Sequence, residues 1–259
     1  MTITIYQVDA FTDKLFGGNA AAVCPLEEWP PDAAMQSIAE ENNLSETAFF
    51  MRRGEVFDIR WFTPKIEIAL AGHPTLATAH VIFRHLGYSR PRIDFQSKSG
   101  PLSAERRGDL IFLDFPAFVP EPVPTPPDLV AGLGRAPQQV FKGRDYLALF
   151  DTEEEVLVLA PDFAVLNRLD CLGIIATAPG RRSDFVSRFF APQAGINEDP
   201  VTGSAHTLLI PFWAERLGKR ELHAFQVSKR RGELFCEHRG ERVGIGGRAV
   251  TYLQGTLAL

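Results

Sequence analysis

Hydrophobic and polar residues alternate at the start of the chain and recur at helical spacing soon afterwards. Residues 2–11 alternate between the two types, which predicts a β-strand. Residues 31–43 carry Ala34, Ile38 and Ala39 on what would be one face of a helix, so a helix is predicted there. The chain is therefore expected to open with a strand followed by a helix.

Four more strands and a hydrophobic helix are predicted in the rest of the N-terminal half. The first two strands cover 47–52 and 56–63. Residues 75–86 are apolar on nearly every side, so this second helix is expected to be buried. Gly72-His73-Pro74 marks its start, because proline is tolerated in a first turn, and Gly87 marks its end. Shorter strands are predicted at 93–96 and 110–115.

Proline dominates the segment 116–127, with six prolines in twelve residues. Such a segment cannot continue a helix or a central strand, so it is predicted to be an extended connector. The predicted division is an N-terminal α+β lobe over 1–116, a connector over 117–127 and a C-terminal α+β lobe over 128–259.

The C-terminal half is predicted to contain the same kinds of element, short strands and one long apolar helix. A second apolar helix is predicted over 207–217, with an internal Pro211 and an end at Gly218. Strands are predicted at 140–150, 156–160, 172–177, 185–190, 221–228, 233–237 and 248–257.

Two segments of the chain resemble each other. Residues 60–64 (Arg-Trp-Phe-Thr-Pro) precede the glycine of 71–75, and residues 188–192 (Arg-Phe-Phe-Ala-Pro) precede the glycine of 202–206. The two copies are 128 residues apart at the prolines and 131 at the glycines. Each copy has a strand, a loop, a glycine and an apolar helix in that order, which predicts two lobes of similar build.

Composition and charge exclude several classes of protein. The 259 residues, 45% of them hydrophobic and 23% charged, are typical of a globular protein. A net charge of -5 lacks the basic excess of nucleic-acid binders. The three cysteines are widely spaced, which predicts a reducing compartment and no disulfides. The N-terminus has no basic region ahead of an apolar one, so no signal peptide is expected, and no apolar run is long enough for a membrane span. We therefore expect a cytoplasmic protein.

Candidate chemistry gathers at the two predicted helix starts. A helix N-terminus leaves backbone N–H groups unpaired and attracts anions, so Gly72-His73 and Gly203-Ser204 could bind a substrate carboxylate if the lobes face each other. Acid–base candidates are His73, Asp199, Ser204 and Glu46. Glu46 lies where a helix gives way to an apolar strand, and partial burial there would suit a general base.

Each candidate also has a purely structural interpretation. Glu46 could be a solvated turn carboxylate, His73 and Ser204 could cap their helices, and Asp199 could belong to an ordinary Asp-Pro turn. His80 and His206 are better explained as core histidines.

The sequence contains no motif that is typical of a metal or cofactor site. The sequence has no zinc-type spacing and no phosphate loop, so no metal and no nucleotide is expected. Residues 244–249 fit GxGxxA, but a strand-like run follows where a dinucleotide site needs a helix. Gly17-Gly18-Asn19-Ala20 is either a turn or a close backbone approach to a ligand.

Seven short motifs together resemble those of the PhzF-like phenazine-biosynthesis isomerase family. They run in the family's order and cover nearly the whole chain. The motifs are residues 8–12, 17–23, 43–47, 62–64, 71–75, 199–205 and 247–250.

The resemblance implies a diaminopimelate-epimerase-like fold. In this α+β fold two pseudo-symmetric lobes each wrap a curved mixed sheet around a central helix, and the active site lies in the cleft between them. The resemblance also implies cofactor-independent proton transfer in a homodimer, with a small carboxylate such as a dihydro-hydroxyanthranilate as substrate.

The resemblance further implies roles for individual residues. Glu46 would move the proton between substrate carbons, while His73 and Asp199 would contact the substrate and assist. Gly72, Gly203 and Ser204 would bind its carboxylate.

Two other functions remain open. The chain could be a small-carboxylate-binding protein with the same fold and no turnover, or a thiol-dependent racemase. Racemases of the wider superfamily carry a cysteine at each helix start, whereas this chain has Gly72-His73 and Gly203-Ser204 there. Its three cysteines lie elsewhere in the order of motifs.

Overall fold

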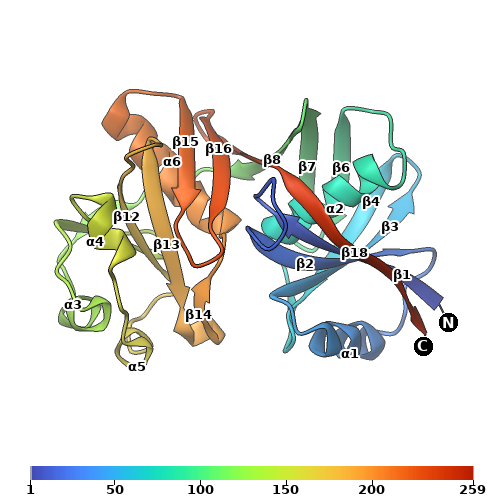
Figure 1. Cartoon of the computed structure of the whole chain (residues 1–259), viewed down its shortest axis with the longest axis horizontal. Coiled ribbons are helices and arrows are strands. Elements are labelled where there is room, and N and C mark those ends of the chain that lie inside the picture. The colour runs from blue at the N-terminus through green and yellow to red at the C-terminus, as the bar shows by residue number, and fades with distance from the viewer. Residues whose placement is uncertain (1, 259) are drawn as a thin grey trace. The chain divides into compact units, whose positions relative to one another are not determined.

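The computed structural model describes residues 2–258, which form two compact units (Figure 1). Unit 1 contains the residues up to Phe115 and those from Ile245 onward, and unit 2 contains Pro116–Gly244. The fold is of the α+β class, as predicted, with mixed sheets and few helices.

The division differs from the predicted one at two places. The last strand, β18 (Ala249–Ala258), returns to unit 1 because it pairs antiparallel with β1 (Thr2–Ala10) along nearly its whole length. The proline-rich segment is part of unit 2, where β9 (Glu121–Val123) pairs with β10 (Gln139–Lys142). Proline is tolerated there because β9 is short and the helix α3 (Pro127–Leu133) begins with a proline, where no N–H is needed.

Unit 1 is a mixed sheet with two helices. β1 pairs antiparallel with β2 as well as with β18, and from β2 onward the order is β2, β3, β4, β6, β7, β8. The β2–β3 and β4–β6 pairs are parallel and the other pairs are antiparallel. Its further elements are β2 (Asn19–Leu26), α1 (Asp32–Asn42), β3 (Glu46–Arg53), β4 (Val56–Phe62), β5 (Glu67–Ile68), α2 (His73–Arg84), β6 (Arg92–Ser97), β7 (Gly100–Arg107) and β8 (Leu110–Pro116).

The helix α2 is the buried centre of unit 1. Ten of its twelve residues are buried, and it packs against β1, β2, β3, β7 and β18 (Figure 1). This burial explains the apolar character that the sequence shows around the whole helix. The helix α1 instead buries one face, with Met35, Ile38 and Ala39 in a cluster with Cys24 and Phe49 of the sheet.

Unit 2 has the same order of strand pairings as unit 1. β11 and β12 are parallel, β12 and β13 antiparallel, β13 and β15 parallel, and β15 and β16 antiparallel. These pairs match β2–β3, β3–β4, β4–β6 and β6–β7 of unit 1. The elements are α3 (Pro127–Leu133), β11 (Tyr146–Leu149), α4 (Glu153–Leu157), α5 (Phe163–Leu166), β12 (Ile174–Pro179), β13 (Phe185–Ala191), a 3₁₀ turn (Pro192–Ala194), β14 (Ile196–Asp199), α6 (Gly203–Leu217), β15 (Glu221–Gln226), β16 (Gly232–His238) and β17 (Arg242–Gly247).

The arginines of the sequence repeat occupy equivalent places in the two units. Arg60 on β4 binds both carboxylate oxygens of Glu67 at 2.8 and 2.9 Å. Arg188 on β13 binds both carboxylate oxygens of Glu198 at 2.7 and 2.9 Å. Matching strand orders and matching two-point ion pairs establish that the repeat is structural.

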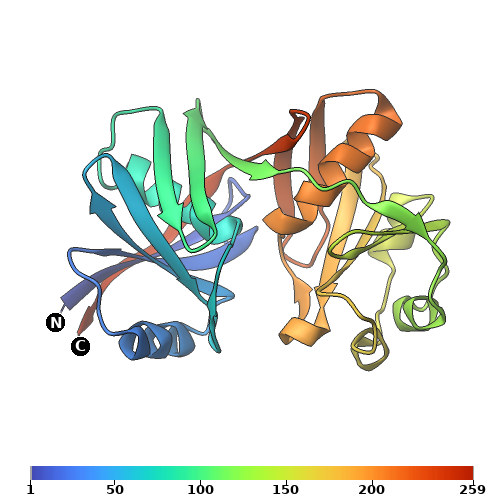
Figure 2. The ribbon, with the colours of Figure 1, turned by 180° about the vertical axis from the view of Figure 1, so that it is seen from behind.

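The helix α6 is the long apolar helix of unit 2 and lies against β15 and β16 (Figure 2). Pro211 has no N–H to donate to the carbonyl of Thr207 one turn earlier. The backbone N–H of Phe118 donates to that carbonyl instead, at 3.0 Å. The helix therefore continues to Leu217 and ends at Gly218, whose φ of 63° is left-handed.

Two expectations about local structure need correction. The segment predicted as a strand at 156–160 overlaps the helix α4, because Thr152 and Glu155 form a capping box that starts a helix. Residues 140–150 form two strands, β10 and β11, instead of one. No helix among residues 2–258 has the length and apolar character needed to cross a membrane.

Candidate active site

Glu46 and His73 come together in unit 1. Glu46 is the first residue of β3, and His73 is the first residue of α2. Their side chains are almost fully buried, and His73 Nε2 lies 3.1 Å from Glu46 Oε2. The distance is that of an ion pair, but the approach lacks hydrogen-bond geometry, so His73 Nε2 is not saturated by this contact.

Asn19 fixes the orientation of the His73 ring. The amide nitrogen of Asn19 lies 3.2 Å from His73 Nδ1. The amide oxygen of Asn19 accepts a hydrogen bond from the hydroxyl of Ser45 at 3.4 Å. With the amide nitrogen as donor, Nδ1 is the acceptor, so the neutral ring carries its hydrogen on Nε2. Nε2 is also the ring nitrogen that lies near Glu46 Oε2.

Burial keeps His73 neutral. It lowers the pKa of His73 from 6.5 to about 3, and a hydrogen bond with the Ala20 backbone opposes this effect only in part. At neutral pH the pair is therefore a carboxyl group beside a neutral imidazole. His73 therefore adds no positive charge beside Glu46 at neutral pH.

A glycine turn brings Asn19 to this place. Gly18 has a left-handed φ of 59°, and a Cβ atom there would lie 2.0 Å from the carbonyl oxygen of Ala10. The chain thus turns here between β1 and β2, as one of the two interpretations of this segment predicts.

Neither central helix has a side-chain cap at its start. Gly72 precedes α2 and makes no cap, and Thr202 precedes α6 without capping it. His73 does not act as a cap, in contrast to the structural interpretation. Backbone N–H groups at both starts therefore depend on other partners, and their dipoles favour an anion.

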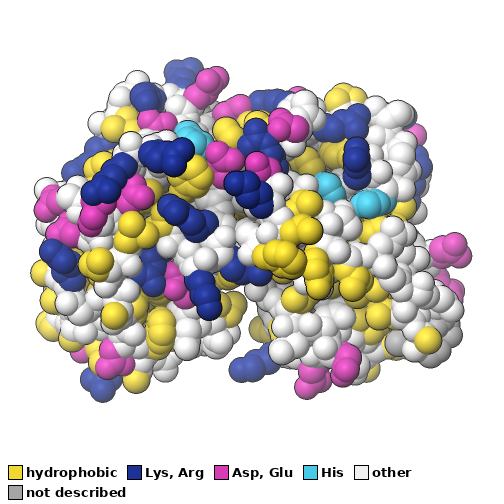
Figure 3. Space-filling view, viewed as in Figure 1, with side chains coloured by type: hydrophobic (Ala, Val, Ile, Leu, Met, Phe, Trp, Pro, Cys, Tyr) yellow, Lys and Arg dark blue, Asp and Glu magenta, His cyan; other side chains and the backbone are white. Residues whose placement is uncertain are grey.

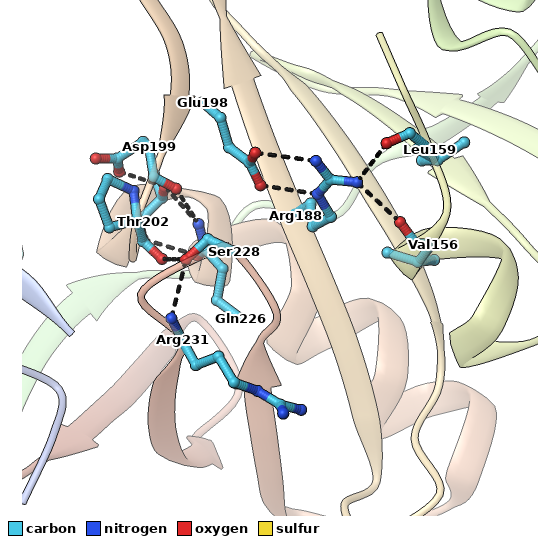
Figure 4. A network of polar contacts seen from close by, with 10 residues as sticks. Val156, Leu159, Arg188, Glu198, Asp199, Thr202, Gln226, Ser228 and Arg231 are labelled. Atoms are coloured by element: carbon cyan, nitrogen blue, oxygen red, sulfur yellow. Dashed lines mark hydrogen bonds and ion pairs between the residues drawn. The ribbon is translucent and has the colours of Figure 1, made fainter. Parts of the chain in front are cut away.

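The hydroxyl of Thr202 is engaged with Asp199 in unit 2, which is why it does not cap α6 (Figure 4). It donates a short hydrogen bond to Asp199 Oδ2. The fully buried Gln226 accepts from the Thr202 backbone N–H at 2.8 Å and donates to the Asp199 carbonyl at 2.8 Å. Asp199 is therefore held in a fixed position at the end of β14, immediately before α6.

The neighbouring residue Glu198 points away from Asp199 (Figure 4). Successive side chains of a strand point to opposite faces, so Glu198 reaches Arg188 while Asp199 reaches Thr202. Arg188 also donates to the carbonyls of Val156 and Leu159 at 3.1 and 2.8 Å. This ion pair anchors the strand that carries Asp199.

The predicted site residues fall into two groups. Glu46, His73 and Gly72 lie together in unit 1, and Asp199, Gly203 and Ser204 lie together in unit 2 at the start of α6. Glu46 is buried, which excludes the solvated-turn interpretation. Sequence reasoning did not identify Asn19, Thr202 or Gln226 as site residues. Thr202 has a local signal in its spacing of three residues from Asp199, and Asn19 lies in the glycine-containing segment 17–20 that the sequence singles out.

The other two histidines singled out from the sequence differ from each other. His206 is fully buried, its Nδ1 lies 2.8 Å from the Thr202 carbonyl, and burial lowers its pKa to about 4. It supports the turn that carries Thr202, as a core histidine does. His80 is half-buried and hydrogen-bonds to Thr251.

The cysteines are unsuited to acid–base chemistry. All three are buried and free. Burial raises the pKa of Cys24 to about 12 and that of Cys171 to about 11, and it also raises that of Cys236. Thiols of this kind stay protonated at neutral pH, which argues against a thiol-dependent racemase.

Comparison with known proteins shows which family the chain belongs to. Residues 8–255 match the family model of the phenazine biosynthesis-like proteins. An uncharacterised isomerase of Pseudomonas aeruginosa is 54% identical over 259 residues, with both chains covered completely. The crystal structure of a PhzF family protein from Enterococcus faecalis is 47% identical, covers 100% of both chains and superposes with a TM-score of 0.98.

A more distant structure shares the fold alone. A probable proline racemase from Agrobacterium radiobacter is 12% identical, covers 99% of this chain and 93% of its own, and has a TM-score of 0.66. The match over residues 8–255 and the full-length relatives establish that the chain belongs to the phenazine biosynthesis-like (PhzF) family of isomerases.

Proposed function

We propose that this protein is a cofactor-independent isomerase that moves a proton between two carbons of a small carboxylate, with Glu46 as the acid–base residue. The observation that carries the proposal is the buried Glu46–His73 pair, 3.1 Å apart, whose orientation Asn19 fixes. A carboxylate can serve as a general base when it is positioned beside the substrate, and the neutral His73 next to Glu46 adds no positive charge there.

The proton transfer has two steps. Glu46 takes a proton from a substrate carbon, so that the C–H bond breaks, an O–H bond forms on Glu46, and the electron pair delocalises toward the substrate's unsaturated carboxylate. Glu46 then returns the proton to a different carbon, and the double bond moves. The Nε2–H of His73 faces the same region and would donate a hydrogen bond to the developing charge.

The substrate carboxylate would bind at the helix starts. Backbone N–H groups at Gly72-His73 and at Gly203-Ser204 lack side-chain caps, and helix dipoles favour negative charge at both places. We propose, as the family resemblance implies, that the two starts serve one site in a cleft between the units. Asp199, held by Thr202 and Gln226, would contact the amine or hydroxyl of the substrate.

The substrate class follows the family resemblance. We propose a dihydro-hydroxyanthranilate or a closely similar cyclic amino or hydroxy acid. Its ring carries a carboxylate next to an acidic C–H bond, which matches an anion site beside a carboxylate base. The protein is further expected to act as a cytoplasmic homodimer in a biosynthetic process. Size-exclusion chromatography with light scattering tests whether it is a dimer.

The proposal is tested by NMR with the purified protein in D₂O and a dihydro-hydroxyanthranilate. The expected result is an isomerised product with deuterium at the carbon that receives the proton. Binding of the compound without deuterium incorporation or product would contradict the proposal and favour a carboxylate-binding protein without turnover. Nucleic acids and membranes are not expected partners.

A further inference from the structure

A pocket of about 610 Å³ lies in unit 1, at the opposite end of α2 from His73. A pocket of this size is in the range of small-molecule sites. The last turn of α2, the β7–β8 hairpin and the start of β18 surround it. Its polar lining residues are His80, Arg84, His85, Arg106, Asp109 and Thr251.

Two arginines give the pocket a positive charge that no carboxylate cancels. Among residues 2–258, neither Arg84 nor Arg106 has an ion-pair partner. The guanidinium of Arg106 stacks on the ring of Phe83, 4.8 Å from its centroid, which leaves its N–H edge for a ligand. The one lining carboxylate, Asp109, is bound to Arg248 at 2.6 Å.

Two histidines and a hydroxyl add polar groups to the same wall. His80 Nε2 lies 3.0 Å and His85 Nε2 2.7 Å from the hydroxyl oxygen of Thr251. Burial and then the positive potential of His85 and Arg84 lower the pKa of His80 to about 4. The positive charge of Arg84, one of the causes of this lowering, also favours an anion in the pocket. Figure 3 shows histidine side chains at the surface of unit 1 with arginine or lysine side chains close by.

We propose that this pocket binds a phosphate group, as free inorganic phosphate or on a small phosphorylated metabolite. Arg84 and Arg106 would hold the phosphate oxygens through charge-assisted hydrogen bonds, and Thr251 with the two imidazoles would complete the polar shell. The volume exceeds that of phosphate alone and leaves room for the body of a metabolite. The site is distinct from Glu46 and does not depend on the isomerase proposal.

Isothermal titration calorimetry of the full-length protein tests this site with three probes: inorganic phosphate, ribose 5-phosphate and ribose. Phosphate is expected to bind with a Kd of about 1 mM or tighter, and ribose is expected not to bind. Arg84→Ala and Arg106→Ala should each weaken phosphate binding at least about tenfold, the effect of one lost charge-assisted hydrogen bond. Tighter binding of ribose 5-phosphate than of phosphate would assign a metabolite, and the reverse would assign the free ion.

The matched control is Arg92→Ala, which makes the same change in net charge. Arg92 is exposed on β6, pairs with Asp94 and does not line the pocket, so its variant should bind phosphate as the wild type does. Circular dichroism would verify that each variant is folded. The proposal is overturned if neither phosphate compound binds the wild type up to about 10 mM, or if Arg92→Ala weakens binding as much as the two pocket variants.

Discussion

His73 Nε2 faces Glu46 Oε2 at 3.1 Å, with both side chains almost removed from water. The start of a strand and the start of a helix are brought together because β3 lies beside β2 and α2 packs on both strands. Asn19, the first residue of β2, then reaches the far nitrogen of the His73 ring. Three elements of unit 1 thus determine the environment of a single carboxyl group.

The neutral state of His73 predicts a pH dependence of stability. The folded protein has a pKa of about 3 for this group, whereas the unfolded chain titrates near 6.5, so the unfolded state binds the extra proton between these values. As the pH falls from 6.5 toward 4, the group should lower the free energy of unfolding by about 1.4 kcal/mol per pH unit. Urea denaturation of the wild type and of His73→Gln measures the contribution as the difference between their slopes. Equal slopes would show that His73 is not held neutral.

Removing the Asn19 amide should reduce turnover without unfolding the protein. Asn19→Ala loses the donor to His73 Nδ1, so the ring hydrogen can move from Nε2 to Nδ1 and the donor beside Glu46 is lost. A loss of about 1–3 kcal/mol corresponds to a reduction of kcat by about fivefold to 150-fold. Nitrogen-15 NMR of the ring reports the tautomer directly. An unchanged tautomer and unchanged kcat would remove Asn19 from the site.

The Arg188–Glu198 pair should be important for the stability of unit 2. Arg188→Ala breaks a two-point ion pair that is mostly buried and frees two backbone carbonyls. The expected loss is about 3 kcal/mol in the free energy of unfolding, measured with urea. Arg53→Ala is the control, because its pair with Asp58 involves an arginine exposed to 67% and should change stability by less than about 1 kcal/mol. Equal effects of the two substitutions would contradict this role.

The cysteines should be unreactive and dispensable for turnover. Burial raises the pKa of the Cys24 and Cys171 thiols to about 12 and 11, so almost no thiolate forms at neutral pH. A thiol reagent such as dithiobis-nitrobenzoate should react slowly with the folded protein and rapidly after unfolding. Fast modification of the folded protein with loss of isomerase activity would instead support thiol chemistry.

Hydrophobic periodicity identified α1, α2, α6 and most long strands, because each buries a face that its sequence pattern marks. It could not identify β2, whose sequence Asn-Ala-Ala-Ala-Val-Cys-Pro-Leu is mostly apolar and does not alternate. The strand is paired on both sides and covered by α2, so alternation is not required. The strand prediction for residues 156–160 was wrong because the capping box that starts α4 outweighs the β-propensity of these residues. A pattern of apolar residues does not reveal such a cap.

The residues of the candidate site could be predicted where they lie in short local motifs. Glu46, His73 and Asp199 belong to short motifs, and their burial follows from the elements beside them. Gln226 contacts Asp199 and Thr202 from β15, a strand that follows them in the chain after the whole of α6. Such a contact depends on how the sheet assembles, and no local pattern encodes it.

The most direct measurement of the central claim is the exchange of substrate hydrogen with D₂O by Glu46→Gln. The variant keeps the size and polarity of the side chain but cannot accept a proton, so exchange should fall by about 10²–10⁴-fold while substrate binding and folding persist. Glu41→Gln, which removes the same charge from the exposed end of α1, should exchange as the wild type does. Exchange at the wild-type rate in Glu46→Gln would contradict the account.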